Sequence, residues 1–193
     1  LTVLVWSFSF LAAARLRQDL GLTEALAARF VPVLVGSGAY LLAKRPLRIP
    51  RAAWPTIVAM GLLSVPAYNV FFFHGLKTVP SGTGALVIAL NPVFTAVLAR
   101  TVLGEPFGPR HVAGLTLALA GVFVVIRYGT DKAVDWPYLS SALLLALAPL
   151  SWAFYAVLGR KLPEGADPLD TSYALLFVGS LPLLAFARPS TAA

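Results

Sequence analysis

The residues best suited to bind a solute are polar or aromatic side chains inside long apolar runs, and the clearest pair is Asn91 and Pro92. They interrupt the middle of an uncharged run at residues 81–99. Pro92 has no N–H, so the carbonyl of Ile88 loses its helical hydrogen-bond partner, and Asn91 adds an amide beside it. Polar groups inside a hydrocarbon layer require protein or a wet cavity to satisfy them. The pair therefore indicates either a solute contact at a broken helix or a packing kink, and both interpretations stay open.

Four other side chains share these properties. Tyr68 and Asn69 follow Pro66 by two and three residues, beside a second interrupted helical hydrogen bond. Trp6 and Trp152 present aromatic faces that suit organic solutes and cations, although each also fits a role in packing. The candidate solute-binding residues are thus Trp6, Tyr68, Asn69, Asn91 and Trp152.

Motifs for other chemistry are missing from the sequence. It has no HExxH, no P-loop, no Gly-x-Ser-x-Gly and no closely spaced acidic pair inside an apolar run. Cysteine is absent, which excludes disulfides, thiol redox chemistry and cysteine-based metal sites. We therefore expect no enzyme activity, no cofactor and no metal.

The composition is that of a membrane protein. Of the 193 residues, 59% are hydrophobic and 12% charged, and the mean hydropathy is +0.82. Soluble domains carry about twice that charged fraction. The net charge of +7 would suggest nucleic acid in a soluble protein. Here the Lys and Arg residues lie between apolar runs, where they set topology and meet anionic headgroups, so we expect no nucleic-acid partner.

The chain contains seven uncharged or nearly uncharged apolar runs. They cover residues 1–14, 25–43, 52–73, 81–99, 112–126, 136–159 and 171–187. Most approach the roughly 20 residues that a helix needs to cross a bilayer, whereas strands of a membrane barrel would alternate over about 10 residues. The short links between runs make neighbouring helices antiparallel. The expected fold is all-α: a polytopic transmembrane helix bundle with about seven helices present.

The basic residues predict the orientation of the bundle. One set of run ends carries eight of them: Lys44, Arg45, Arg48, Arg51, Arg100, Arg110, Arg160 and Lys161. The 44–51 link holds the densest cluster, and the positive-inside rule places that link in the cytoplasm. We expect Glu105, at the same end, to neutralise Arg100 or Arg110.

Small residues indicate where helices approach each other closely. One such face lies in the 81–99 run and is made of Gly82, Gly84, Ala85 and Ala89. A second, made of Gly114, Ala118 and Gly121, lies in the 112–126 run. We expect both faces to be packing seams.

An internal echo indicates two related units. Trp6-Ser7-Phe8 followed by Arg15 resembles Trp152-Ala153-Phe154 followed by Arg160. The offset is five helices, and an odd number inverts the second unit in the membrane, as in many secondary transporters. We therefore expect a first five-helix unit at residues 1–130, its first helix truncated, and the first two helices of a second unit at residues 136–193. The chain begins without methionine, and we expect it to be a fragment.

A known family shares these features. The run Val79-Pro80-Ser81-Gly82-Thr83-Gly84-Ala85-Leu86, then Asn91-Pro92-Val93-Phe94 and Leu103-Gly104-Glu105, resembles the EamA-type repeat of the drug/metabolite transporter superfamily. The resemblance implies a ten-helix protein of two inverted five-helix repeats that exports small metabolites by alternating access. It also implies a cavity formed mainly by the first, third and fourth helices and their counterparts, which makes Trp6, Tyr68, Asn69 and Asn91 cavity candidates.

The expected function is secondary transport across a cell membrane, the bacterial inner membrane. The expected cargo is a small metabolite, such as an amino acid or a drug, and the direction is export. Two alternatives stay open: a carrier of sugars, nucleotide-sugars or lipid-linked molecules, and a non-transporting membrane scaffold. The expected partners are a small-molecule substrate and the lipid bilayer, and a homodimer is left open.

Overall fold

The structure is a computed structural model that describes residues 22–76, 78–128 and 136–186. Every regular element among these residues is helical, which confirms the all-α prediction. The elements are α2 (Leu22–Ala43), η1 (Arg51–Ala53), α3 (Trp54–Leu62), η2 (Leu63–Ala67), α4 (Tyr68–Gly75), α5 (Ser81–Ile88), α6 (Asn91–Leu103), α7 (Pro109–Tyr128), α8 (Trp136–Gly159) and α9 (Pro168–Phe186). The first apolar run and Trp6 lie outside the described residues.

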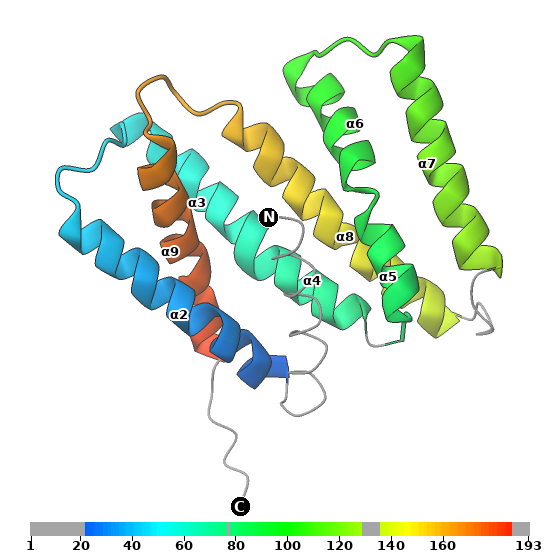
Figure 1. The fold of residues 1–193 in the computed structure, drawn as a ribbon, viewed down its shortest axis with the longest axis horizontal. Helices are drawn as coiled ribbons and strands as arrows, with labels where there is room; N and C mark the ends of the chain where they lie inside the picture. Colours follow the sequence, from blue (N-terminus) through cyan, green and yellow to red (C-terminus); the bar gives the residue numbers. More distant parts are fainter. Residues whose placement is uncertain (1–21, 77, 129–135, 187–193) are drawn as a thin grey trace, which may run out of the picture.

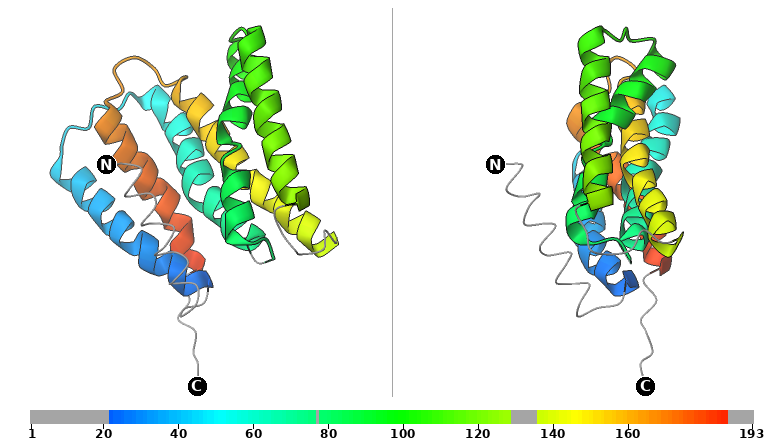
Figure 2. Two further views of the ribbon diagram at one scale, coloured as in Figure 1. Left: turned by 45° about the vertical axis from the view of Figure 1, so that its right-hand side comes forward. Right: turned by 90° about the vertical axis from the view of Figure 1, so that its right-hand side faces the viewer.

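Successive helical spans run in opposite directions, as the short links predict (Figure 1). The links at residues 44–50, 104–108 and 160–167 all lie at the upper end of Figure 1, so the larger basic set gathers at one end of the molecule. Turned about the vertical axis, the same helices form a narrow slab (Figure 2). In order across the slab lie α2, α9, α3–α4, α8, α5–α6 and α7.

The predicted third span is one continuous helical stretch, from Arg51 to Gly75, with an irregular centre. Pro66 lies inside η2, a π-helical segment between α3 and α4. Proline cannot donate the hydrogen bond that its position requires, and the wider π turn lets the chain continue without a break. The N–H of Tyr68 then bonds the carbonyls of Leu63 and Val65, and α4 begins there.

The predicted fourth span is broken where its sequence indicates. α5 ends at Ile88, two turn residues follow, and α6 begins at Asn91 with Pro92 in its first turn, where a missing N–H costs nothing. α6 ends at Gly104, whose φ of 72° requires glycine and lets the N–H of Glu105 reach back 3.3 Å to the carbonyl of Ala99. The span is therefore two helices joined at Asn91.

Close helix contacts use one predicted glycine and several others. A Cβ at Gly84, on the predicted face of the 81–99 run, would overlap Cδ2 of Leu76 and lie 3.5 Å from Cδ2 of Leu145 on α8. A Cβ at Gly61 would lie 2.6 Å from the carbonyl oxygen of Leu175, so α3 and α9 touch backbone to backbone. A Cβ at Gly75 would lie 2.6 Å from the Cα of Leu145, which brings α4 against α8 in the same way. Added Cβ atoms at Gly114 and Gly121 would meet nothing within 4 Å. The predicted seam on α7 is wrong for the described part of the chain.

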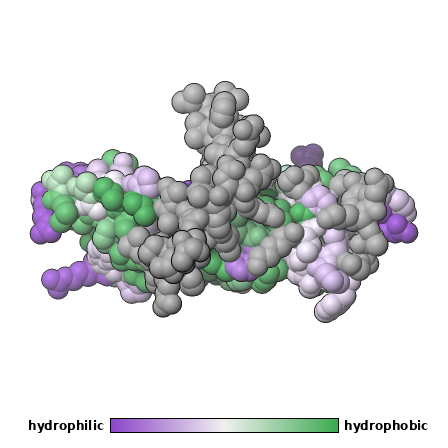
Figure 3. Space-filling view, turned by 90° about the horizontal axis from the view of Figure 1, so that it is seen from below, coloured by the Kyte–Doolittle hydropathy of each residue, from purple (hydrophilic) through white to green (hydrophobic). Residues whose placement is uncertain are grey.

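The surface confirms a membrane protein. Three stretches among the described residues are long and apolar enough to cross a bilayer: Arg51–Gly75, Thr83–Leu103 and Trp136–Gly159. Large apolar side chains such as Leu117, Phe123 and Leu143 are exposed. Seen from below, apolar residues cover much of the described surface, and the strongest hydrophilic colour lies toward its left and right edges (Figure 3). Lipid must cover such a surface, because exposing so many apolar side chains to water is unfavourable.

Candidate functional site

A pocket lies beside the break between α5 and α6. It has a volume of about 400 Å³. Its walls come from α6, the α6–α7 link, α7 and the end of α8: Asn91, Pro92, Thr95, Ala96, Ala99, Glu105, Pro106, Phe107, His111 and Arg160. Asn91 is half-buried, and its Oδ1 accepts a hydrogen bond from the hydroxyl of Thr95 at 3.3 Å, one turn further along the same helix. A polar amide and hydroxyl thus face an open space within an apolar span.

Charged side chains border this pocket at its loop end. The carboxylate of Glu105 forms an ion pair with Arg160, and the two side chains are 48% and 49% exposed. Arg100 reaches only the backbone carbonyl of Glu105, at 3.3 Å. The prediction that Glu105 neutralises Arg100 or Arg110 is therefore wrong, because the end of α8 returns beside the α6–α7 link and supplies a nearer cation.

An aromatic group joins α4 to α8. The ring centroids of Tyr68 and Trp152 lie 5.8 Å apart, edge to face, and Trp152 lies 5.0 Å from the ring of Tyr155. On the other side, Tyr68 stacks on Phe72 at 5.9 Å. Two of the candidate residues, Tyr68 and Trp152, thus meet although they belong to different predicted repeat units. Trp6, whose sequence context resembles that of Trp152, lies outside the described residues.

Among the candidates that the structure describes, Asn69 is the most deeply buried, at 3% exposure. Its amide nitrogen donates to the carbonyl of Val65, in the π segment, at 2.7 Å. Its Oδ1 is buried and has no hydrogen-bond partner among the described residues. A buried acceptor left unpaired costs about 1–3 kcal/mol. Asn69 therefore offers a fixed acceptor to a donor such as water or a solute.

The candidates do not share one pocket. Asn91 lines the 400 Å³ space, whereas Tyr68, Asn69 and Trp152 are not among its lining residues. They lie instead on the neighbouring α4–α8 pair, and α8 packs against both α4 and α6. The described candidates therefore fall into two places: Tyr68, Asn69 and Trp152 at the contact of α4 with α8, and Asn91 on α6.

A charged cluster that the sequence prediction missed joins α2 to α9. Asp170, 0% exposed, accepts hydrogen bonds from the hydroxyl of Tyr40 at 2.9 Å and from the backbone N–H of Arg48 at 2.8 Å, and Lys44 lies 2.8 Å from its carboxylate. The ring of Tyr40 also stacks on Tyr173, one turn along α9, at 3.9 Å. In the sequence, Lys44 and Asp170 each lie at the end of an apolar run, and nothing there indicates that they pair.

The charged groups of this cluster, Lys44 and Asp170, lie at the loop ends of α2 and α9, just outside the apolar runs. The hydrogen bond from Lys44, together with that from the Arg48 backbone, lowers the pKa of the Asp170 carboxyl from 3.8 to about 2. Hydrogen bonds to Asp170 and Tyr40 raise the pKa of the Lys44 ammonium above its ordinary value. Both groups are therefore charged at neutral pH. The cluster therefore holds the loop ends of α2 and α9 together.

Known proteins resemble this chain over most of its length. The EamA-like transporter family matches residues 1–127. The uncharacterized transporter YyaM of Bacillus subtilis is 32% identical over 66% of this chain and 42% of its own length. A probable terminal-alkyne amino-acid exporter of Streptantibioticus cattleyicolor is 30% identical over 95% of this chain and 61% of its own length. The aromatic amino acid exporter YddG of Ancylobacter novellus is 30% identical over 66% of this chain and 44% of its own length.

The chain spans 42% to 61% of the length of these three curated relatives. No solved structure matches it. Among the described residues, no group of three or more His, Cys, Asp or Glu side chains is placed to hold a metal ion.

Proposed function

Because the chain belongs to the EamA-like transporter family, we propose that it is part of a secondary transporter that exports a small organic solute by alternating access. The observation that carries the proposal is the broken span α5–α6, with Asn91 at the break and an open pocket beside it. A helix interrupted inside a membrane is costly unless protein or a wet cavity satisfies the freed polar groups. Many secondary transporters use such interrupted helices to bind their solutes.

The depth of Asn91 fits this role. α6 has 13 residues from Asn91 to Leu103, so Asn91 lies about 18 Å from the loop end of the helix. The hydrocarbon core is about 30 Å thick, which puts the amide near its middle. Glu105, His111 and Arg160 line the same pocket toward the end that we predict to be cytoplasmic. Entry from that side favours export.

The aromatic group on α4 and α8 supports an organic solute. Tyr68, Trp152 and Tyr155 present ring faces that bind apolar or cationic groups, and the free acceptor of Asn69 lies next to Tyr68 in the chain. The names of two relatives specify export of amino acids. We therefore propose an amino-acid-like solute and a bacterial inner membrane as its setting.

These 193 residues contain no cysteine, and any cysteine elsewhere in the full-length protein is replaced by serine before the test. Asn91→Cys is introduced into the full-length protein in membrane vesicles and exposed to a membrane-impermeant thiol reagent from each side. Val93→Cys, buried on the same helix, is the matched control. The thiol of Asn91→Cys should react from the cytoplasmic side, and the thiol of Val93→Cys should not. A thiol at position 91 that is unreactive from both sides would indicate a sealed kink and favour the scaffold alternative.

A further inference from the structure

A second pocket lies at the loop end of α2, away from the Asn91 pocket. It has a volume of about 670 Å³, within the range of roughly 300–1,000 Å³ typical of ligand pockets. Leu41 and Leu42 of α2, Leu47 of the following link and Phe177 of α9 supply apolar walls. The ring of Phe177 lies against Gly38, where an added Cβ would come within 3.1 Å of it. The pocket is thus an apolar groove between two packed helices.

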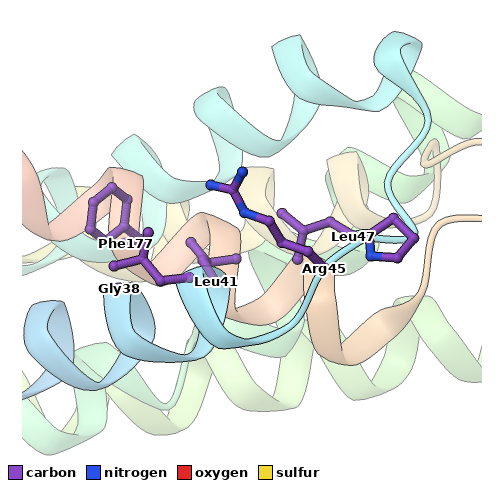
Figure 4. Close-up of a pocket in the computed structure, with 7 residues that line it drawn as sticks. Gly38, Leu41, Arg45, Leu47 and Phe177 are labelled. Carbon is purple, nitrogen blue, oxygen red and sulfur yellow. The ribbon is translucent and has the colours of Figure 1, made fainter.

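Arg45 supplies the one charged side chain in the lining of this groove. Figure 4 shows its side chain extending from the α2–α3 link back over Leu41, with the guanidinium above the apolar residues. Arg45 forms no ion pair among the described residues, whereas the adjacent Lys44 is neutralised by Asp170. The groove therefore has an apolar floor and an unpaired cation at its rim.

The nearby charges increase the positive potential at the rim. Arg48 and Arg51, in the same link, also make no ion pair within the described part of the chain. On the α8–α9 link, Asp167 uses a carboxylate oxygen to accept hydrogen bonds from the backbone N–H groups of Leu169 and Asp170. The positive charge of three arginines is thus left without a compensating ion pair in the described structure.

We propose that this groove binds an anionic phospholipid of the cytoplasmic leaflet. The phosphate contacts the guanidinium of Arg45, and an acyl chain lies along Leu41, Leu42 and Phe177. Leu42 is 72% exposed, so the groove opens outward, where a bilayer lies. The link belongs to the end that the positive-inside rule assigns to the cytoplasm, and basic pockets between helices on that side bind anionic headgroups.

The site differs from the solute pocket in its elements and its chemistry. It is formed by α2 and α9, whereas the Asn91 pocket is formed by α6, α7 and α8. A bound lipid would contact both α2 and α9 and so stabilise their packing next to the Lys44–Asp170 ion pair. Lipid binding is therefore measured independently of transport, and Asn91→Cys should leave it unchanged.

The experiment measures lipid binding to the purified full-length protein in a neutral detergent. Phosphatidylglycerol is compared with phosphatidylcholine of the same acyl chains, by native mass spectrometry and by the shift in melting temperature. The variants are Arg45→Gln, which removes the charge, and Leu42→Ser, which weakens the apolar wall. Arg110→Gln is the matched control, because Arg110 is an exposed arginine at the same end but lines neither pocket.

We expect phosphatidylglycerol to bind more tightly than phosphatidylcholine and to raise the melting temperature of the wild type and Arg110→Gln. Arg45→Gln should bind phosphatidylglycerol about fivefold more weakly, the effect of one basic residue at an anionic lipid. Leu42→Ser should weaken both lipids.

Four results would contradict the proposed lipid site. Equal binding by Arg45→Gln and wild type would exclude the headgroup contact, and an equal loss in Arg110→Gln would show diffuse electrostatic attraction. Full displacement by inorganic phosphate would identify a free-phosphate site. A wild type that prefers neither lipid but changes oligomeric state on Leu42→Ser would identify the groove as a contact between copies of the chain.

Discussion

The ammonium of Lys44 lies 2.8 Å from the carboxylate of Asp170, and this ion pair connects the end of α2 to the first turn of α9. The acid is fully buried and accepts from Tyr40 and from the Arg48 backbone as well. In the folded state, these protein groups and Lys44 compensate its charge in place of water. α2 and α9 also form one of the most extensive helix pairs among the described residues. The pair thus connects the loop ends of two helices that belong to different predicted repeat units.

Removing the acid should destabilise this helix pair. Asp170→Asn leaves Lys44 without its counter-ion and replaces a carboxylate that accepts from three donors, and breaking a buried ion pair is much costlier than losing an exposed one. We expect the melting temperature of the purified protein to fall by several degrees. Glu164→Gln, an exposed acid on the α8–α9 link, is the control and should be neutral. Equal melting temperatures for Asp170→Asn and Glu164→Gln would show that the ion pair does not stabilise the contact of α2 with α9.

The same pair predicts a stability loss in acid. The pKa of Asp170 is lowered to about 2 in the folded protein from 3.8, so its contribution is complete above about pH 4 and is lost as the pH falls toward 2. The raised pKa of Lys44 acts in the opposite range: its contribution is complete below 10.5 and is lost only at still higher pH. Melting temperatures between pH 2 and pH 7 should thus fall more steeply for wild type than for Asp170→Asn. Parallel curves would exclude this titration.

The contact between α3 and α9 predicts a second stability difference. Gly179→Ala places a methyl group against the carbonyl oxygen of Gly61, and backbone cannot yield as a side chain can. The expected cost is about 1–3 kcal/mol. Gly114→Ala, also in a helix but with nothing within 4 Å of the new Cβ, should be neutral or slightly stabilising. Urea or thermal unfolding of both variants checks the difference, and a Gly179→Ala as stable as Gly114→Ala would refute the close approach.

Much of the fold follows from the sequence, because apolar runs separated by short charged links leave few arrangements. The break at Asn91-Pro92 and the helix end at Gly104 could also be predicted, since proline and glycine act through local backbone chemistry. The π turn at Pro66 could not. Whether a proline breaks, kinks or widens a helix depends on the neighbours that pack around it, and these are distant in sequence.

The candidate site could be predicted less completely for the same reason. Tyr68 and Trp152 stand out separately as unusual side chains, but their contact across α4 and α8 is a tertiary fact. The Lys44–Asp170 pair escapes prediction because each charge follows the ordinary pattern of residues at span ends. Among glycines, the predicted Gly84 is closely packed, but the clustered glycines of α7 are not, and close approach also occurs at the isolated Gly61, which faces another helix.

The break in the fourth span predicts a separation of transport from stability. Pro92→Ala restores an N–H that can bond the carbonyl of Ile88 and so favours a continuous helix through the turn between α5 and α6. The polar groups at the break would then be withdrawn from the pocket. We expect solute export to fall at least tenfold while the melting temperature is unchanged or higher, measured in the same preparation. Full export by Pro92→Ala would show that the break has no role in transport.

We expect the Glu105–Arg160 pair to affect transport more than stability, the reverse of the Lys44–Asp170 pair. Both side chains are about half exposed, so solvent screens their attraction and the pair should contribute no more than about 1 kcal/mol to folding. In the proposed transporter, their position on the pocket that contains Asn91 would make them a barrier or a guide for a charged solute. Glu105→Gln should therefore leave the melting temperature nearly unchanged but alter the KM of export. The double exchange Glu105→Arg with Arg160→Glu keeps the pair and reverses its polarity across the pocket. If the field at the pocket matters, the exchange restores stability but not KM; if KM also recovers, the pair acts only by linking α6 to α8.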